Sequence, residues 1–554
     1  MKRPIFSSFN KSLLACACAS GLMLSTTQAQ RIAAGQQATA VAGQPVKTVF
    51  YILMENRNFT AGTDTTGGSV LVGNPAAPYI NSLITPGNAN AAQVSWCSAY
   101  HHVLSTASGA NPSIHPSEPN YIWMEAGSNL SKADDNDPYG SNSSVKQIET
   151  YLANNPGVSG QHLSGLLQAA NISWKSYQEG IDHLNSAGNN INTGGSGMTN
   201  TLAPQSAWTV PLQSFSGTSA NYTNPYNGSH QYNFACKHNG SLYFLDTNGS
   251  SLGAANLSPS NLVTYNYAPL EQLATDLANN AVARYNVITP DQYNDMHTAL
   301  SNGFAYKGTT YTGDKAQVAQ GDNFLSILVP QIMASQAYQD NGAIVIWTDE
   351  TEGTNQNDFN HTLMEIVISP LAKGNAYNST VNLTHSSDVA TMQQIFQVTA
   401  NTATGYLNDA ANSSNSAGAL AGSATGFGTG VAQDMSDLFV AGAIPSGLPS
   451  TRVTAGGYTV NRRNNTATQT VTVTNSLTTP ISNPIYLVVS NLNTTLINRT
   501  GTTQNTAPVG SQYVFVASGL AAGASANVVL QFTLPANNAG IVDTLSSVSS
   551  SGQP

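Results

Sequence analysis

The stretch VFYILMENRNFT, residues 49–60, runs from an apolar segment directly into a pair of polar side chains. Its first six residues, Val49–Met54, are all apolar or aromatic. A short continuous run of this kind is typical of a strand buried in a parallel sheet. Glu55 and Asn56 follow it at once. Because ligands of open α/β sheets bind beyond the carboxyl ends of the strands, we expect these two side chains to face a site.

Residues 46–440 alternate such apolar runs with helix-like segments, which predicts an α/β domain with a mostly parallel sheet. The expected strands are Val49–Met54, Ile172–Tyr177, Tyr285–Thr289, Ala343–Thr348 and Glu365–Ser369. The expected helices are Pro78–Ile84, Pro119–Ala126, Gln161–Ala170, Gly321–Ser335 and Ser387–Gln397. Residues 185–260, rich in Asn, Ser, Gly and Tyr, are expected to form long surface insertions. Their aromatic stretch Tyr222–Tyr243 either lines a cleft or packs the insertion onto the core.

The pattern changes after Pro445. Thr468–Thr474 reads TQTVTVT, a strict alternation typical of a half-buried strand, and further short strand patterns follow between turn residues. No convincing helix pattern interrupts them. Residues 450–540 are therefore expected to form an accessory all-β sandwich domain. A glycan, another protein and the chain's own catalytic domain all remain candidates for its partner.

Composition narrows the choice of partners. The chain has 554 residues, long enough for two or more domains. Only 8% of its residues are charged and the formal net charge is −10. Without basic runs, nucleic acid and anionic membrane surfaces are poor partners. No segment after the N-terminus has the 18 or so apolar residues of a spanning helix, so no membrane span is expected.

Residues 1–29 have the features of a signal peptide. A basic start, MKRPIFSSFNK, precedes the apolar run SLLACACASGLMLS and a small-residue cleavage site after Ala29. This predicts a secreted or periplasmic protein. The alternative is a lipoprotein, because Leu13–Cys16 weakly resembles a lipidation box. The mature chain keeps Cys97 and Cys236, for which a disulfide and two buried free thiols are both open interpretations.

A second acidic pair lies at the end of another expected strand. Asp349 and Glu350 come just after the apolar run Ala343–Trp347. Acidic oxygens that meet at one edge of a sheet repel one another unless a cation lies between them. Together with Glu55 and Asn56, these residues predict a site for a divalent metal ion. The alternative is that each pair caps a neighbouring helix or loop.

Ser117 stands at the expected start of a helix in HPSEPNYIWMEAG, residues 115–127. Pro119 suits a first helical turn and Gly127 suits a C-terminal end. Ser117 either caps this helix or serves as a nucleophile. The second interpretation uses the same geometry, because free N–H groups at a helix N-terminus suit a phosphoryl oxygen and a nearby metal activates a hydroxyl.

Several further polar residues follow expected strands or precede a helix. ITPDQYNDMH, residues 288–297, supplies Asp295 and His297, and two more loop histidines are His361 and His385. An imidazole can protonate a leaving oxygen or bind a phosphate oxygen. We expect Asp295 and His385 to bind substrate. The alternative for each is a structural or solvated side chain.

Six motifs in order make the sequence resemble the phosphoesterase family, which groups acid phosphatases with bacterial phospholipases C. They are MEN at 54–56, NPAAPYINSLI at 74–84, HPSEPNY at 115–121, ISWKSYQE at 172–179, ITPDQYNDMH at 288–297 and TDE…NH at 348–361. The family is similar in fold to the alkaline phosphatase superfamily. The resemblance therefore implies an alkaline-phosphatase-like α/β/α sandwich for residues 46–440.

The resemblance also implies roles. Glu55, Asn56, Asp349 and Glu350 match metal ligands, with Asn56 also holding phosphate. Ser117 matches the nucleophile. Three histidines match groups that face the phosphate. His297 and His361 match catalytic residues, and His115 matches a substrate-binding residue. Two-zinc phosphatases usually have Asp-His where this chain has Asp-Glu, which favours a harder, oxygen-rich site and leaves the metal's identity open.

The expected function is hydrolysis of a small phosphate monoester through a phosphoserine, with a divalent metal as cofactor. One alternative is a phospholipase C-type phosphodiesterase, although Arg57-Asn58 replaces the His-Ser common in that branch. The other alternative is a secreted binding or adhesion protein whose α/β domain is catalytically silent.

Overall fold

The computed structural model describes residues 45–60, 70–101, 116–140, 143–193, 195–248, 266–352, 362–402, 404–408, 434–445, 447–506, 508–536, 539–550 and 554. The signal-peptide prediction for residues 1–29 lies outside these ranges. Within them, no helix has both the length and the hydropathy needed to cross a bilayer.

The centre of the molecule is an eight-stranded sheet with the order β14-β2-β13-β12-β1-β9-β3-β8. Its strands are β1 (Thr48–Met54), β2 (Val94–Cys97), β3 (Trp174–Gln178), β8 (Tyr267–Pro269), β9 (Tyr285–Thr289), β12 (Gly342–Thr348), β13 (Glu365–Ile368) and β14 (Tyr377–Ser379). Only β13 runs against the others. The predicted α/β class and mostly parallel sheet are confirmed, and all five expected strands are present. Sequence reasoning missed the short strands β2, β8 and β14.

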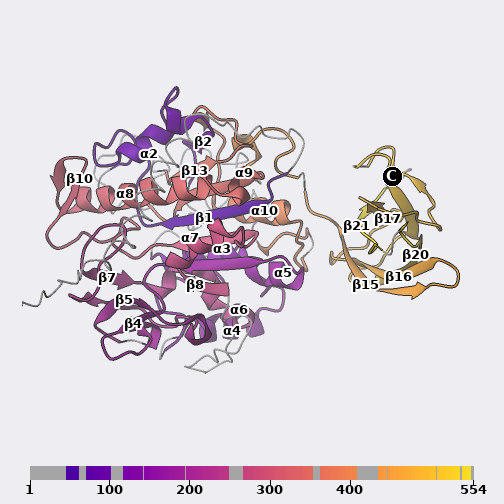
Figure 1. Cartoon of the computed structure of the whole chain (residues 1–554), viewed down its shortest axis with the longest axis horizontal. Coiled ribbons are helices and arrows are strands. Elements are labelled where there is room, and N and C mark those ends of the chain that lie inside the picture. Colours follow the sequence, from indigo (N-terminus) through magenta and orange to yellow (C-terminus); the bar gives the residue numbers. More distant parts are fainter. Residues whose placement is uncertain are drawn as a thin grey trace, which may run out of the picture.

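Helices cover both faces of this sheet (Figure 1). Alternate residues of β1 point to opposite sides. Val49, Tyr51 and Leu53 join the core formed with α3 (Glu118–Ala126), α5 (Leu163–Ala169) and α10 (His385–Phe396). The residues between them join the core formed with α2 (Pro78–Leu83), α7 (Glu271–Ala278) and α8 (Asp314–Met333). The predicted α/β/α sandwich is therefore confirmed. Helix α8 begins seven residues earlier than expected, at Asp314.

The segment expected to form surface insertions packs largely onto the core. It contains two hairpins, β4 (His183–Asn185) with β5 (Met198–Leu202) and β6 (Phe215–Thr218) with β7 (Gln231–Phe234). Rings from this segment, including Tyr222, are buried in the main core. Of the two interpretations left open for the aromatic stretch, packing onto the core is therefore observed, and burying these rings removes a large apolar area from water. The segment ends in the 3₁₀ turns η4 (Cys236–His238) and η5 (Gly240–Tyr243) and the helix α6 (Leu245–Asn248).

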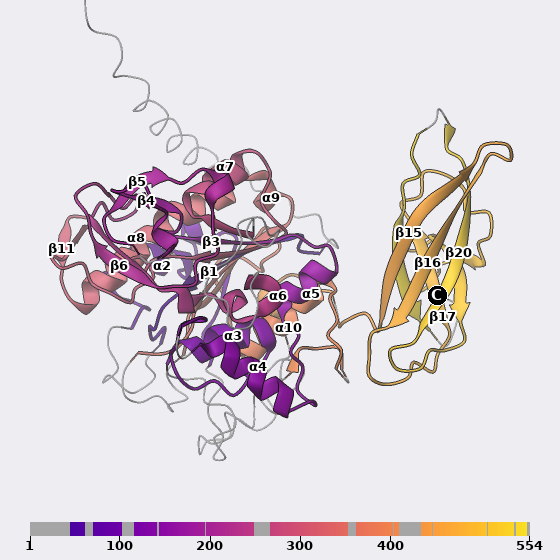
Figure 2. The same ribbon diagram turned by 90° about the horizontal axis from the view of Figure 1, so that it is seen from below.

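The C-terminal part of the chain forms two antiparallel sheets that stand beside the α/β body (Figure 2). One sheet contains β15 (Thr451–Asn461), β16 (Thr466–Asn475) and β20 (Ser525–Thr533). The other contains β18 (Gly501–Thr502), β19 (Gln512–Ala517), β17 (Ile485–Ser490) and β21 (Thr544–Ser549). Apolar residues from both sheets form one shared core, as in a β-sandwich. The all-β character expected for this region is confirmed.

The structure does not contain the predicted disulfide between Cys97 and Cys236, which are both buried free thiols. Cys97 ends β2. Cys236 begins η4, whose His238 carbonyl accepts a hydrogen bond from Thr289 in β9 at 3.4 Å. Four strand spacings of about 4.8 Å separate β2 from β9, whereas a disulfide needs Cα atoms within about 7 Å. Burial raises the pKa of Cys97 to about 12, so its thiol is un-ionised at neutral pH.

A buried arginine links three loops at the carboxyl edge of the sheet. Arg57, 1% exposed, follows the end of β1. Its Nη2 and Nε donate to the carbonyl of Met296 at 2.7 and 3.2 Å. Nη1 forms ion pairs with Asp314 at the start of α8 and with Glu352 beyond β12. The guanidinium thus ties the segments after β1, β9 and β12 to one another.

Several other acidic side chains are buried in a way that favours the protonated form. Asp388 of α10 accepts the hydroxyls of Tyr51 and Tyr100 on one oxygen, both at 2.6 Å. Burial raises the pKa of Asp388 to about 7, and the carboxylate of Glu365 lies close enough to interact with it. Burial likewise raises the pKa of Asp182 to about 7. Such groups bind protons in the folded chain at pH values where the unfolded chain has released them.

We expect Arg57→Met to lower the free energy of unfolding by about 3 kcal/mol, because it leaves the carbonyl of Met296 and two carboxylates without their donor. Urea unfolding measures this value. Arg284→Met is the matched control, since Arg284 is exposed and its Nε donates to the carbonyl of Lys47. An equal loss in both variants would contradict a special role for Arg57.

We expect the pH dependence of stability to change in Asp388→Asn. The folded pKa of Asp388, about 7, lies above its unfolded value of about 4, so its contribution is present at low pH and is lost as pH rises through this window. The variant should therefore gain stability relative to the wild type between pH 5 and pH 8. Thermal unfolding at both pH values measures the difference. An identical change in Tm for both proteins would show that Asp388 does not titrate there.

Candidate active site

The pairing of β1 with β12 brings the two acidic strand ends together. Met54 pairs with Thr348 in parallel register, and the N–H of Asp349 donates to the carbonyl of Met54 at 3.3 Å. Glu55, Asp349 and Glu350 are fully buried or nearly so. Each offers a carboxylate oxygen, and these oxygens lie within 4.8 Å of one another. The predicted convergence of residues almost 300 positions apart is therefore present.

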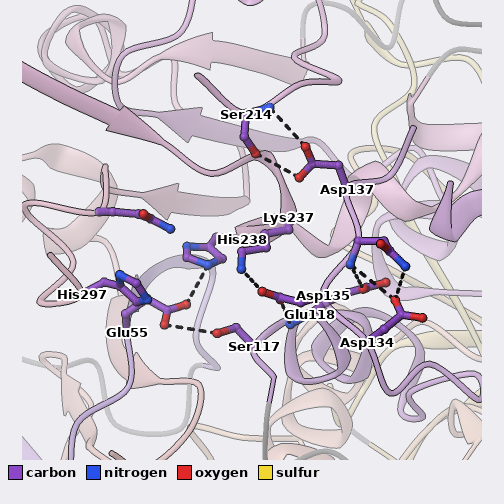
Figure 3. A network of polar contacts seen from close by, with 12 residues as sticks. Glu55, Ser117, Glu118, Asp134, Asp135, Asp137, Ser214, Lys237, His238 and His297 are labelled. Atoms are coloured by element: carbon purple, nitrogen blue, oxygen red, sulfur yellow. Dashed lines mark hydrogen bonds and ion pairs between the residues drawn. The ribbon is translucent and has the colours of Figure 1, made fainter. Parts of the chain in front are cut away.

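Ser117 faces this cluster from the start of α3 (Figure 3). It occupies the N-cap position, but its side chain makes no capping hydrogen bond. Its hydroxyl lies 2.9 Å from Glu350 Oε1 and 3.3 Å from Glu55 Oε2. Asn120, one turn on, reaches Glu350 Oε2 at 3.4 Å. The helix N-terminus thus directs a hydroxyl at two carboxylates, and Gly127 ends the helix in a left-handed conformation as expected.

The electrostatics of the cluster suit a cation. Neither carboxylate oxygen of Asp349 has a hydrogen-bond partner among the described residues. Burial, followed by the charges of Glu55 and Glu350, raises the pKa of Asp349 well above its usual range. Burial opposes the ionisation of Glu55 too, but the neighbouring His238 holds its pKa below the usual value. Three carboxylates around one point are a donor set that fits a hard divalent cation.

The two residues predicted in the loop after β9 lie beside Glu55. His297 is half-buried, and its ring centroid is 6.4 Å from that of His238. Asp295 is buried, and its oxygens accept the N–H of His297 at 2.8 Å and face His238 Nδ1 at 3.7 Å. Asp295 was expected to bind substrate; in the structure its carboxylate is directed at these two histidine residues.

His385 does not line the site. It is fully buried as the first residue of α10. Its Nε2 lies 2.9 Å from the carbonyl of Asp349, and its Nδ1 lies 2.9 Å from the hydroxyl of Tyr100. Burial lowers its pKa to about 3, so the ring is neutral. The structure gives no support to the substrate-binding prediction for His385, since both ring nitrogens contact groups of the fold and the residue supports the backbone of Asp349.

Three other predicted residues remain to be placed. His115 and His361 lie outside the described residues. Asn56 is half-buried next to Glu55, and its backbone N–H donates to Glu55 Oε2 at 3.4 Å.

Sequence reasoning missed two side chains that contact Glu55. The Tyr121 hydroxyl donates to Glu55 Oε1 at 2.9 Å, and His238 Nε2 lies 3.0 Å from the same oxygen. Although burial opposes protonation, Glu55 and then Asp295 raise the pKa of His238 to about 9. Tyr121 is the last residue of the HPSEPNY motif, residues 115–121. The polar residues that follow Pro119 in this motif could have marked it as a candidate. His238 lies in a segment without periodicity, where only the rarity of histidine (10 in the chain) marked it.

Lys237, also missed, brings a positive charge near the cluster. Its ammonium forms an ion pair with Asp135 (Figure 3). Burial opposes the charge, but Asp135 and then Glu55 and Glu350 raise its pKa. The N–H of Glu118, next to Ser117, donates to the other oxygen of Asp135 at 3.4 Å. Asp135 thus contacts both the Lys237 ammonium and the start of the helix that carries Ser117.

Comparisons with solved structures give distant matches. A protein of the alkaline phosphatase superfamily from Vibrio parahaemolyticus is 10% identical, with 64% of this chain and 67% of that chain covered and a TM-score of 0.30. The lipoteichoic acid synthase LtaP from Listeria monocytogenes is 11% identical, with 67% and 78% covered and a TM-score of 0.32. The sulfatase PsFucS1 from Pseudoalteromonas sp. is 10% identical, with 92% and 88% covered and a TM-score of 0.33. Structural matches with TM-scores this low carry no argument about activity.

Comparison with curated protein sequences finds no match. The sequence model of the phosphoesterase family, in contrast, matches residues 91–399, more than half of the chain. This range includes Ser117, Asp349 and Glu350, three of the four side chains that meet at the carboxyl edge of the sheet. The protein belongs to the phosphoesterase family and is a hydrolase of ester bonds.

Proposed function

We propose that the protein is an exported, metal-dependent phosphomonoesterase that works through a phosphoserine at Ser117. The observation that carries this proposal is the position of the Ser117 hydroxyl, 2.9 Å from Glu350 and 3.3 Å from Glu55, at the start of a helix and beside three buried carboxylates. A hydroxyl at this position is suited to attack a phosphoryl group whose charge the site can bind.

Glu55, Asp349 and Glu350 would hold the divalent cation, with Asn56 as a fourth oxygen donor. When bound, the cation would act as a Lewis acid toward the phosphoryl group and the attacking oxygen. Its identity is left open, although an all-oxygen donor set favours Mg²⁺, Mn²⁺ or Ca²⁺ over zinc.

In the first step, Ser117 Oγ forms a bond to phosphorus and gives its proton to Glu350 Oε1, the carboxylate oxygen that it already contacts. The bond from phosphorus to the ester oxygen breaks, and that oxygen takes a proton from the imidazole of His297 as the alcohol leaves. In the second step, water gives a proton to His297 and attacks phosphorus. The Oγ–phosphorus bond breaks, Ser117 regains its proton from Glu350, and inorganic phosphate is released.

Phospholipase C-type diester hydrolysis is the alternative within the phosphoesterase family. Diester hydrolysis would need the same phosphoryl site. Arg57 does not help to choose between the two esters, because it is buried and directed at loops of its own chain. The meeting of Ser117 with three carboxylates supports an enzyme over a silent relic. The low content of basic residues supports a small phosphate ester over nucleic acid as partner.

We expect Ser117→Ala to lower the turnover of an aryl phosphate by about 1,000-fold or more, because it removes the nucleophile. Rapid acid quenching with ³²P-labelled substrate should trap a phosphoprotein in the wild type and none in the variant. Ser164→Ala is the matched control, since Ser164 is a buried serine that donates to a carboxylate, Glu125, outside the site. Turnover retained by Ser117→Ala would place the nucleophile elsewhere.

We expect chelation to abolish activity, because without the ion three buried carboxylates lose their counter-charge. A single divalent ion per chain should restore it. Elemental analysis and reactivation with Mg²⁺, Mn²⁺, Ca²⁺ and Zn²⁺ measure stoichiometry and identity. Full activity in protein freed of metal would refute the metal-dependent mechanism.

A substrate panel tests the ester class with the reloaded enzyme. An aryl phosphomonoester should be hydrolysed faster than an aryl phosphodiester, an aryl sulfate and phosphatidylcholine. Preference for phosphatidylcholine would replace the monoesterase proposal with the phospholipase C alternative. Activity toward none of the four would overturn the monoesterase proposal and point to another class of ester.

A further inference from the structure

His238 is the residue by which the long insertion reaches the acidic cluster (Figure 3). It ends the 3₁₀ turn η4 and is 2% exposed. Its ring stacks on that of Tyr121, with centroids 5.0 Å apart and planes 12° apart. One nitrogen lies 3.0 Å from Glu55 Oε1, and the other lies 3.7 Å from Asp295 Oδ2. The ring therefore lies between Tyr121 on one face and a carboxylate near each nitrogen.

The two oxygens of Glu55 have different surroundings. Oε1 lies next to both the Tyr121 hydroxyl, at 2.9 Å, and His238 Nε2, at 3.0 Å. Oε2 lies on the side of Ser117, whose hydroxyl is 3.3 Å away. Oε2 also accepts the backbone N–H of Asn56 at 3.4 Å, but the two side chains that hold Glu55 from outside the site, Tyr121 and His238, both lie at Oε1.

We propose that His238, supported by Tyr121, is a positioning residue that fixes Glu55 so that it presents a single oxygen, Oε2, to the cation. The proposal rests on the metal site of the proposed function. Under this proposal the insertion helps to build the metal site. It does so through His238, which does not belong to the strand ends that supply the carboxylates.

The contacts of Asp295 extend this support. Its Oδ1 accepts the N–H of His297, and its own backbone carbonyl accepts the N–H of Glu55 at 2.8 Å. Asp295 therefore faces His238 with its carboxylate and binds the backbone of Glu55 with its carbonyl. Residues that orient a metal ligand typically change metal affinity by about 10–100-fold when they are removed. His238 has the position of such a residue.

Titration of the metal-free protein with Mn²⁺, followed by electron paramagnetic resonance of the free ion, tests the proposal without relying on turnover. We expect His238→Leu, which keeps bulk but removes both nitrogens, to raise the Kd for Mn²⁺ by about 10–100-fold. His238→Gln, which can place an amide N–H near Glu55, should recover much of the affinity. Tyr121→Phe keeps the stacked ring, removes one donor and should weaken binding several-fold.

His183→Leu is the matched control. His183 is buried, its Nε2 lies 3.1 Å from a carboxylate of Glu271, and its Nδ1 contacts the carbonyl of Thr199. It therefore has the same kind of partners in the same insertion, outside the acidic cluster. We expect it to leave the Kd for Mn²⁺ unchanged, whatever it does to Tm.

The outcomes separate this inference from the proposed function. Mn²⁺ affinity equal to the wild type in both His238→Leu and Tyr121→Phe would overturn the positioning role while leaving the metal site intact. A wild type that binds no Mn²⁺, Mg²⁺, Ca²⁺ or Zn²⁺ would overturn the metal site and this inference together. If His238→Leu fails to fold, Tyr121→Phe and His238→Gln decide: weaker binding in the first and near-normal binding in the second support the proposal, and unchanged binding in Tyr121→Phe overturns it.

Discussion

The site depends on the mutual repulsion of three carboxylates that the fold holds in one place. Parallel pairing of β1 with β12 requires Glu55 and Asp349 to be neighbours, because Met54 and Thr348 are opposite each other. Two of the three carboxylates have donors from the protein: Tyr121 lies beside Glu55, and Ser117 contacts Glu350. Asp349 has none among the described residues. The fold therefore concentrates negative charge where an ester hydrolase of this family would hold its cation.

Such a cluster is stable only if the loops that carry it are held firmly. Arg57 ties the segments after β1, β9 and β12 together, and His385 supports the carbonyl of Asp349 from α10. These supporting groups are buried, so their contacts are little screened by water. The result is a preorganised set of carboxylates on rigid strand ends, with the hydroxyl of Ser117, the proposed nucleophile, supplied separately by α3.

The sequence predicts the parts of this site that follow from periodicity. Apolar runs that end in polar pairs are the strands, and the rule that parallel strands share one carboxyl edge brings Glu55 to Asp349. The prediction fails where side chains come from segments without a repeating pattern. His238 lies in such a segment, and His385 was expected in a loop rather than in the first turn of a buried helix. The disulfide prediction rested on the oxidising compartment expected for an exported protein. The compartment gives no information on the distance between the two cysteines. Only the three-dimensional path of the insertion shows that Cys236 lies near β9.

The site is assembled from segments spread over almost 300 residues, which has a consequence for biosynthesis. A ribosome must have made β12 and the residues after it before the first acidic strand end meets its partners. Until then, Glu55 and Ser117 belong to a fragment that lacks the other two carboxylates and strand β12, which pairs with β1. Contacts this remote in sequence form late and slowly. Binding of the proposed cation would therefore be coupled to completion of the whole domain, and a truncated or half-made chain would gain no stability from the ion.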